Sequence, residues 1–324
     1  MSAKTLNRPL LAGLILASLL FAGLAAAYFA APHDLSDQAK ASYTVDESGS
    51  GSLQVLPVPP GGDYPFGTDK YGYDLLAKML AGAPYTIGGA LAIAAARTAA
   101  GSALGMLLGY YGSNAGHRRL RQGQEQGQKQ GQAGSPLAGA LNGIPAFVIV
   151  WMIMIGISMN PAASPLAMTL MIGAVLTLVG IPPVISTMRA KTGLIKEKAF
   201  ITAAQSIGAG HGTIVRRHIW PHLKESIAVL FVQEVVLALG LFGQLAIFNV
   251  FVGGTTQFFD PVEYVSRSNE WSGLIGQARD NLFVHQWLLL YPLGAYIAFI
   301  LALYWVSIGL EKHYRHKYAK QSLL

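Results

Sequence analysis

The sequence predicts an all-α, polytopic membrane protein with six transmembrane helices and both termini in the cytoplasm. Of its 324 residues, 52% are hydrophobic and only 12% are charged, a composition typical of chains with several membrane spans. Apolar runs long enough to cross a bilayer recur along the chain. Basic residues gather in alternate connecting segments, which fixes the predicted orientation.

Each predicted span rests on an uncharged apolar run. The first contains 23 residues, and about 20 suffice to cross a bilayer. A cleaved signal peptide is the alternative because Ala25–Ala27 offers small residues for cleavage, but a signal peptide's apolar region has only about 7–15 residues. We favour an uncleaved span, and we expect the fourth span to break near its end, at Pro182-Pro183. The six predicted spans are Pro9–Ala31, Pro84–Tyr111, Pro145–Met159, Leu166–Thr187, Ser226–Val252 and Trp287–Leu310.

The segments between these runs divide the chain into regions. Residues 1–31 form the N-terminal transmembrane helix, and residues 32–81 form an extracytoplasmic loop that ends in an interfacial helix over Leu75–Leu80. Residues 82–311 form the main membrane domain, with a second polar loop at 255–285, and residues 312–324 form a basic cytoplasmic tail. Within the domain, residues 113–135 are a Gln/Gly-rich cytoplasmic insert with too little apolar surface to fold.

The net charge of +7 is a topology signal. Seventeen Lys and Arg residues fall on the side of the termini and five on the other side, while Arg97 lies within a span. The positive-inside rule makes the richer side cytoplasmic, where basic residues also face anionic lipid headgroups. No nucleic-acid partner is expected, because the basic insert lacks the interleaved aromatic residues that stack on bases.

A basic cytoplasmic stretch, Lys191–Pro221 in the loop 188–225, is patterned as a docking element. Its apolar positions recur at i, i+3, i+4 and i+7, which places them on one helix face. Gly208 and the residues after it should end that helix, and a second short basic segment, Ile214–Ile219, should end at Pro221. The predicted face consists of Phe200, Ala203, Ala204 and Ile207.

Two further patterns lie inside the predicted spans. Gly101, Gly105 and Gly109 share a helix face on which another helix can approach closely. Arg97 and Glu234 are ionisable groups within the membrane, where a charge is costly unless it is paired or faces water. We predict that these two side chains approach each other or line a translocation path.

The sequence lacks the residues that several kinds of chemistry require. The chain has no cysteine, so disulfides and thiol chemistry do not apply. It contains no G-x-x-x-x-G-K-[ST] phosphate loop. The sequence therefore suggests no catalytic residues, metal ligands or bound cofactor, and any ATP-derived energy must come from a partner.

The cytoplasmic stretch resembles the EAA loop of permease subunits of ABC importers, in which Glu-Ala-Ala is followed by a glycine and then by Leu-Pro. Ala203, Ala204, Gly208 and Pro221 stand at the matching positions. The ending Arg217-His218-Ile219-Trp220-Pro221 looks like that of the peptide/nickel branch. Two departures are Thr202 in place of the glutamate and Trp220 in place of the leucine.

Three other segments resemble the same branch. Residues 66–74 (FGTDKYGYD) are similar to the FGTDxxGRD segment of its C-type subunit, with Tyr73 in place of the arginine. Residues 109–112 (GYYG) close the second span as in the family. Residues 270–273 (EWSG) resemble its P-x-W-G region. Together these matches cover roughly residues 63–318 in the family order.

The resemblance implies the type I ABC importer permease fold for residues 82–311 and a place in a prokaryotic cell membrane. It implies a non-enzymatic subunit that forms half of a pore for a peptide or similar solute. The implied partners are a second permease subunit in a heterodimer, two ATP-binding cassette ATPase subunits that hydrolyse ATP, an extracytoplasmic solute-binding protein and the lipid bilayer. The implied coupling residues are Phe200, Ala203, Ala204, Ile207, Gly208, His218 and Pro221.

Two other function classes were weighed against this one. An ion-coupled secondary transporter is the main alternative, but the sequence has no visible internal repeat and only one acid, Glu234, within a span. An intramembrane enzyme is less favoured, because no G-x-S-x-G or H-E-x-x-H motif is present.

Overall fold

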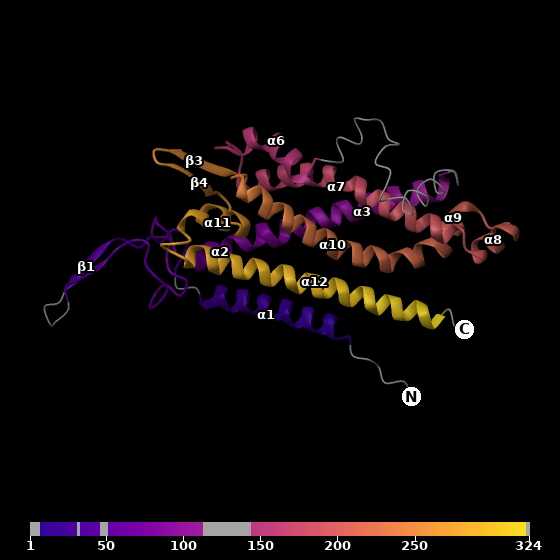
Figure 1. The fold of residues 1–324 in the computed structure, drawn as a ribbon, viewed down its shortest axis with the longest axis horizontal. Coiled ribbons are helices and arrows are strands. Elements are labelled where there is room, and N and C mark those ends of the chain that lie inside the picture. Colours follow the sequence, from indigo (N-terminus) through magenta and orange to yellow (C-terminus); the bar gives the residue numbers. More distant parts are fainter. Residues whose placement is uncertain (1–6, 31–32, 46–50, 113–143, 322–324) are drawn as a thin grey trace.

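The computed structural model describes residues 7–30, 33–45, 51–112 and 144–321. The predicted Gln/Gly-rich insert at 113–135 lies outside these residues, as do Ala31 and the start of the region before the third span. Long helices run side by side as an elongated bundle (Figure 1). In the described part of the chain, five helical runs are long and apolar enough to cross a membrane, and one shorter apolar helix accompanies them.

The first half of the bundle consists of α1 (Arg8–Ala30) and one long helical run, Leu75–Tyr111. That run is made of α2 (Leu75–Ala83), a π-helical turn η1 (Pro84–Gly88) and α3 (Gly89–Tyr111). The helix predicted at Leu75–Leu80 and the span predicted from Pro84 are therefore parts of one continuous helical run. The helix passes Pro84 through the π turn, where bonds that span five residues accommodate a residue without an N–H.

The second half begins with the short α6 (Ala146–Ser158) and α7 (Pro165–Lys196). The predicted break at Pro182-Pro183 is wrong, because α7 continues through both prolines for another thirteen residues. Proline is tolerated inside a membrane helix when neighbouring helices hold the segment. Val184, directly after the pair, is buried against Gly101 of α3 and supplies that support.

A short helix and a long helix follow α7. They are α8 (Ala199–Ser206) and a run from His211 to Ile247, made of α9 (His211–Thr213), a π-helical turn η2 (Ile214–Ile219) and α10 (Trp220–Ile247). Ile214–Ile219 is therefore not a separate segment that ends at Pro221. Pro221 lies in the first turn of α10, directly after the π turn, which accommodates its missing N–H as at Pro84.

The predicted polar loop at 255–285 is folded, which corrects the all-α prediction. It holds an antiparallel hairpin of β3 (Thr255–Phe259) and β4 (Val262–Ser266), then α11 (Trp271–Ala278) and a 3₁₀ turn η3 (Arg279–Asn281). A second hairpin pairs β1 (Ser42–Val45) with β2 (Gly51–Gln54). α12 (Trp287–Gln321) then runs the length of the bundle.

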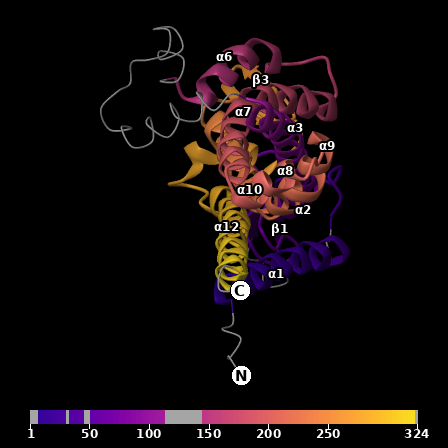
Figure 2. The ribbon, with the colours of Figure 1, turned by 90° about the vertical axis from the view of Figure 1, so that its right-hand side faces the viewer.

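The main core lies where α3, α7 and α10 meet α11 and α12, around Trp271, Phe242 and Leu176, none of which is exposed. α1 packs on α12 at two glycines, since a Cβ on Gly13 would lie 2.7 Å from the Val306 nitrogen and one on Gly309 2.5 Å from Leu10. Seen end-on, α1 forms the edge of the molecule opposite α6 (Figure 2).

The two ends of the bundle differ in structure. One end, which we call the hairpin end, carries β3–β4, α11 and the turn of residues 66–74 (Figure 1). The other, the α8 end, carries α8 and α9, and the start of α1 and the end of α12 also lie there.

Candidate functional site

α8 presents an exposed apolar face at the tip of the α8 end. Ile207 is 86% exposed and Phe200 is 37% exposed, and Ala203 between them is exposed as well. We call these three residues the α8 surface. Ala204 was predicted to share this face, but it is only 6% exposed and points inward. The error arises because an eight-residue helix lying on the bundle must bury one side, and a small-residue pattern does not say which side.

The inner side of α8 is anchored in a second hydrophobic core. Ile201 is fully buried and packs with Ile214, Ile219 and Leu223 of the helix that follows. The predicted face did not include Ile201, although its spacing three residues before Ala204 could have indicated a second apolar stripe. The α8 surface is therefore held against α10 rather than carried on a loose loop.

Gly208 ends α8 in the left-handed conformation, with φ of 83°. The Ala209 N–H donates to the Ala204 carbonyl at 3.0 Å, and the Gly208 N–H donates to the Gln205 carbonyl at 3.0 Å. This pair of bonds is the Schellman motif, which satisfies the last carbonyls of a helix and favours glycine at this position. The prediction that the helix ends at these glycines is confirmed.

Tyr110, at the end of α3, connects α8 and α9 to the bundle. Its hydroxyl lies 2.7 Å from Nδ1 of His211, and its carbonyl accepts a hydrogen bond of 2.7 Å from Nζ of Lys196. Its ring is 3% exposed and belongs to the same core as Ile201. The GYYG segment was noted in the sequence, but contacts between residues about a hundred positions apart leave no pattern in it.

Two other predicted coupling residues lie beside the α8 surface. The ring of His218 is 6.3 Å from that of Phe200 between centroids, and it is half-buried. Pro221 is also half-buried and lies in the first turn of α10. His218 therefore contacts the α8 surface at Phe200, and Pro221 lies three residues further along the same helical run.

The three glycines of α3 face α7 directly. A Cβ on Gly105 would lie 2.7 Å from the Ile185 carbonyl oxygen, and one on Gly109 would lie 2.7 Å from Cβ of Thr192. Gly101 has the same relation to Val184. The backbones of α3 and α7 are thus too close to admit any side chain at these positions, which couples the two helices as one unit.

Arg97 and Glu234 meet inside the bundle. Nη1 of Arg97 lies 3.2 Å from Oε2 of Glu234, and the side chains are 3% and 6% exposed. Nε and Nη2 of Arg97 donate to the Leu176 carbonyl at 3.1 and 2.5 Å. Gly180 makes the space for this, because a Cβ there would overlap the guanidinium. One guanidinium therefore connects α3, α7 and α10.

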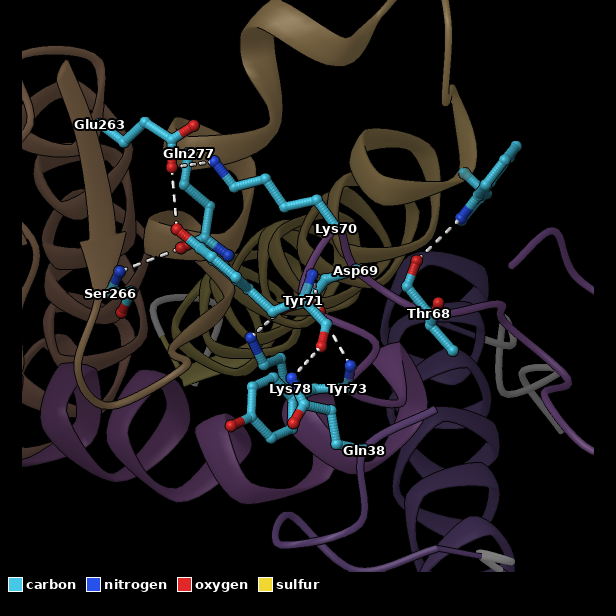
Figure 3. A network of polar contacts seen from close by, with 11 residues as sticks. Gln38, Thr68, Asp69, Lys70, Tyr71, Tyr73, Lys78, Glu263, Ser266 and Gln277 are labelled. Atoms are coloured by element: carbon cyan, nitrogen blue, oxygen red, sulfur yellow. Dashed lines mark hydrogen bonds and ion pairs between the residues drawn. The ribbon is translucent and has the colours of Figure 1, made fainter. Parts of the chain in front are cut away.

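At the hairpin end, residues 66–74 fold into a tight turn around Asp69 (Figure 3). Oδ1 of Asp69 accepts the N–H groups of Tyr71 and Tyr73, both at 2.9 Å, and its other oxygen pairs with Lys78. Gly72 allows the turn with φ of 86°. Asp74 then caps α2 by accepting the Leu76 N–H at 2.8 Å.

The same turn contacts the β3–β4 hairpin. The Tyr71 hydroxyl donates to Oε2 of Glu263 at 2.8 Å, and Lys70 pairs with the same carboxylate. These hydrogen bonds, that from Lys70 foremost, lower the pKa of Glu263 below its usual range. Burial, together with the bond to Glu263, raises the pKa of Tyr71 to about 12.

Glu270 begins α11 and is completely buried. Its carboxylate accepts a 2.6 Å hydrogen bond from the Ser272 hydroxyl and a 3.4 Å bond from the Val252 N–H. Burial raises the pKa of Glu270 to about 7, although these bonds oppose the shift. The next residue, Trp271, donates its N–H to Thr86 at 2.9 Å and its indole N–H to Met79 at 2.9 Å. The EWSG segment thus fastens α11 to α2 and η1.

Across residues 7–30, 33–45, 51–112 and 144–321, no three His, Asp or Glu side chains are grouped so as to hold a metal ion. The distinctive features are an exposed apolar surface at one end, a fixed connection from it to α3 and α10, and a glycine-packed pair of helices.

Comparison with known proteins agrees with this picture. The family described as binding-protein-dependent transport system inner membrane component matches residues 123–316. The oligopeptide transport system permease protein OppC of Salmonella typhimurium is 30% identical over 124 residues, which cover 38% of this chain and 37% of that protein. The glutathione transport system permease protein GsiD of Escherichia coli O1:K1 is 28% identical over 131 residues, 40% of this chain and 39% of that protein.

Each alignment thus spans less than two fifths of the relative's length. The family match is longer and covers more than half of this chain, including α6, α7, α8, α10 and most of α12. This multi-pass membrane protein belongs to the family of binding-protein-dependent transport system inner membrane components, whose members are ABC importer permeases.

Proposed function

We propose that this chain forms half of the translocation pore of an ATP-driven importer and takes its energy from separate ATPase subunits through the α8 surface. The observation that carries the proposal is the two-sided nature of α8. Phe200, Ala203 and Ile207 are exposed, while Ile201 and Ala204 on the other side are buried against the bundle. An apolar helix face of this kind suits a groove on a partner protein.

The connection behind the α8 surface suits the transmission of force. α9, η2 and α10 form one uninterrupted helical run into the bundle, and Tyr110 joins the start of that run to α3. The glycine packing and the Arg97–Glu234 contact hold α3, α7 and α10 together. We infer that movement of a bound ATPase shifts these three helices as a body, with the charge pair as a clamp between them.

The proposed topology has six spans with both termini in the cytoplasm, on the side of the α8 end. The start of α1 and the end of α12 lie at that end (Figure 1), and the predicted cytoplasmic segments hold most of the basic residues. α6, an apolar helix of 13 residues, is assigned to the third of the six spans. Residues 188–225, which hold α8 and α9, form the proposed coupling loop.

The proposed cargo is a peptide or peptide-like solute. The support is the pair of relatives, which are named for oligopeptide and glutathione transport. The proposed assembly contains a second permease subunit, two ATPase subunits and an extracytoplasmic solute-binding protein, as the description of the family implies for binding-protein-dependent transport. ATP hydrolysis takes place on the ATPase subunits.

The proposal is tested by co-purification of the chain with its co-expressed ATPase subunits. Ala203→Glu and Ile207→Glu place a charge on the exposed apolar face. Either change should lower recovery of the ATPase at least about tenfold, because an apolar interface offers no partner to offset the cost of burying a charge. Phe283→Glu is the matched control, since Phe283 is 90% exposed but lies at the hairpin end. Undiminished ATPase recovery with both α8 variants would refute the docking role.

A further inference from the structure

The β3–β4 hairpin has two outer edges, and the edge of β3 is bonded to Asn160 at Thr255 and Gln257. The Asn160 N–H donates to the Thr255 carbonyl at 2.8 Å. The Asn160 side chain then accepts the Gln257 N–H at 2.8 Å and donates to the Gln257 carbonyl at 3.2 Å. The Thr255 carbonyl and both main-chain groups of Gln257, which point away from β4, are therefore already bonded.

The edge of β4 is closed at one point only. The Ser266 N–H points away from β3 and donates to Oε1 of Gln277 at 3.0 Å. Main-chain groups alternate sides along a strand with a period of two, so the N–H and C=O of Tyr264 point the same way. The partner register agrees, since Tyr264 pairs with Gln257, whose groups also point out of the hairpin. No residue in the described part of the chain bonds to these two groups of Tyr264.

This free edge opens into a cavity of about 410 Å³. Four consecutive residues, Val262 to Val265, line it. Side chains of successive residues point to opposite faces of a strand. Four consecutive residues can therefore line one cavity only where the cavity meets the main-chain edge of the strand. The opposite walls are the turn at Asp69–Tyr71 and the end of α11 with η3 (Figure 3).

The cavity lining matches the chemistry of a peptide main chain. Side-chain amides of Asn249, Gln277 and Asn281 provide donors and acceptors around the edge. Charged groups of both signs are present, with Lys70 and Arg279 beside Glu263 and Asp280, which suits a ligand with an amino and a carboxylate terminus. The volume is within the range of small-ligand pockets, about 300–1,000 Å³.

We propose that this cavity binds a short peptide in an extended conformation, added to the free edge of β4 at Tyr264. Main-chain bonding of this kind gives affinity without demanding particular side chains. The choice of peptide as ligand rests on the proposed transport function, whereas the open edge and the cavity do not.

The test uses the full chain in detergent and trialanine as the probe. The chain has no cysteine, so Val262→Cys, at a residue that is 63% exposed on the cavity wall, supplies a single thiol whose labelling rate reports occupancy. Trialanine should slow the labelling in a saturable way. Trialanine N-methylated at its central residue should bind about fivefold or more weakly, because one main-chain donor is lost.

Tyr264→Pro provides the matched protein variant. It removes the N–H that faces the cavity but no bond of the β3–β4 ladder, and it should weaken trialanine about fivefold or more. If this variant does not fold, the N-methylated peptide still decides the question. Equal protection of the thiol by the two peptides would overturn the proposal. The absence of protection by trialanine, in a preparation that still recovers its ATPase, would also overturn it. That second result would leave the proposed transport function standing. Capture of the solute-binding protein, but not of trialanine, by a photo-crosslinker at position 262 would also overturn the proposal.

Discussion

At the scale of single residues, the contact between Arg97 and Glu234 is the most informative. The sequence predicts that two charges within spans either pair or line a path, and the side chains lie 3.2 Å apart. The sequence gives no indication that the Leu176 carbonyl and the space at Gly180 complete the arrangement. Those contributions come from α7, whose backbone reaches Arg97 only because the glycines of α3 allow the two helices to touch.

Removing one member of this pair should cost more than removing both. Arg97→Met or Glu234→Met alone leaves a buried charge without its partner, which typically destabilises a protein by about 3–5 kcal/mol. The double variant leaves neither charge and should recover most of that loss. Thermal unfolding of the four proteins in one detergent measures the coupling, and a double variant whose losses simply add would show that the two groups do not interact.

The buried Glu270 should make the free energy of unfolding decrease as pH rises. Burial raises the pKa of Glu270 from 4.5 to about 7, so between these values the folded protein holds a proton that the unfolded chain has released. The free energy of unfolding then decreases through this window, by about 3 kcal/mol at most, and levels off above pH 7. Below about pH 4.5 the contribution is fully present.

Glu270→Gln should remove this pH dependence, because the amide keeps the shape but does not titrate. The measurement is the unfolding midpoint of both proteins between pH 4.5 and 8 in the same detergent. An identical slope in the variant would assign the titration to other groups.

At the scale of elements, sequence reasoning located the helices better than their ends. The helical prediction with several spans is confirmed, because long apolar runs have few alternatives in a membrane. The errors fall at Pro84, Pro182-Pro183 and Pro221, where helices continue. In each case packing or a π turn compensates for the missing N–H, and neither can be read from the local sequence.

The α8 surface shows the same limit. A period of 3.6 residues identified the correct helix and its end at Gly208. The period does not show which apolar residues are exposed and which are buried against the bundle. Ala204 was therefore assigned to the exposed side, and the buried Ile201 was missed. Which side is buried depends on Tyr110 and Leu223, which are distant in the sequence.

Because the glycines of α3 pack closely against α7, a Gly→Ala substitution should change the stability of the protein differently at two positions. Gly105→Ala puts a methyl group 2.7 Å from the Ile185 carbonyl and should destabilise the protein by about 1–3 kcal/mol. Gly240→Ala in α10 is the matched control, because nothing lies within 4 Å of its Cβ. It should be neutral or slightly stabilising through helix propensity. Equal midpoints of thermal unfolding for the two variants would contradict close packing at Gly105.

At the scale of the whole molecule, the two ends of the bundle differ in structure. The α8 end offers an exposed apolar helix face, and the hairpin end holds a folded polar region with a cavity. The sequence predicted the first through its glycines and periodicity. It reduced the second to polar loops, because the contact that joins the Asp69 turn to the β3–β4 hairpin connects residues 192 positions apart.

We propose that ATP hydrolysis on partner subunits, acting through the α8 surface, drives transport by this chain. It is tested most directly by uptake of a labelled peptide into proteoliposomes that contain both permease subunits, the ATPase subunits and the binding protein. Uptake should require ATP, and Ile207→Glu should abolish it while Phe283→Glu should not. Uptake driven by an ion gradient without the ATPase subunits, unaffected by Ile207→Glu, would contradict the claim and favour an ion-coupled transporter.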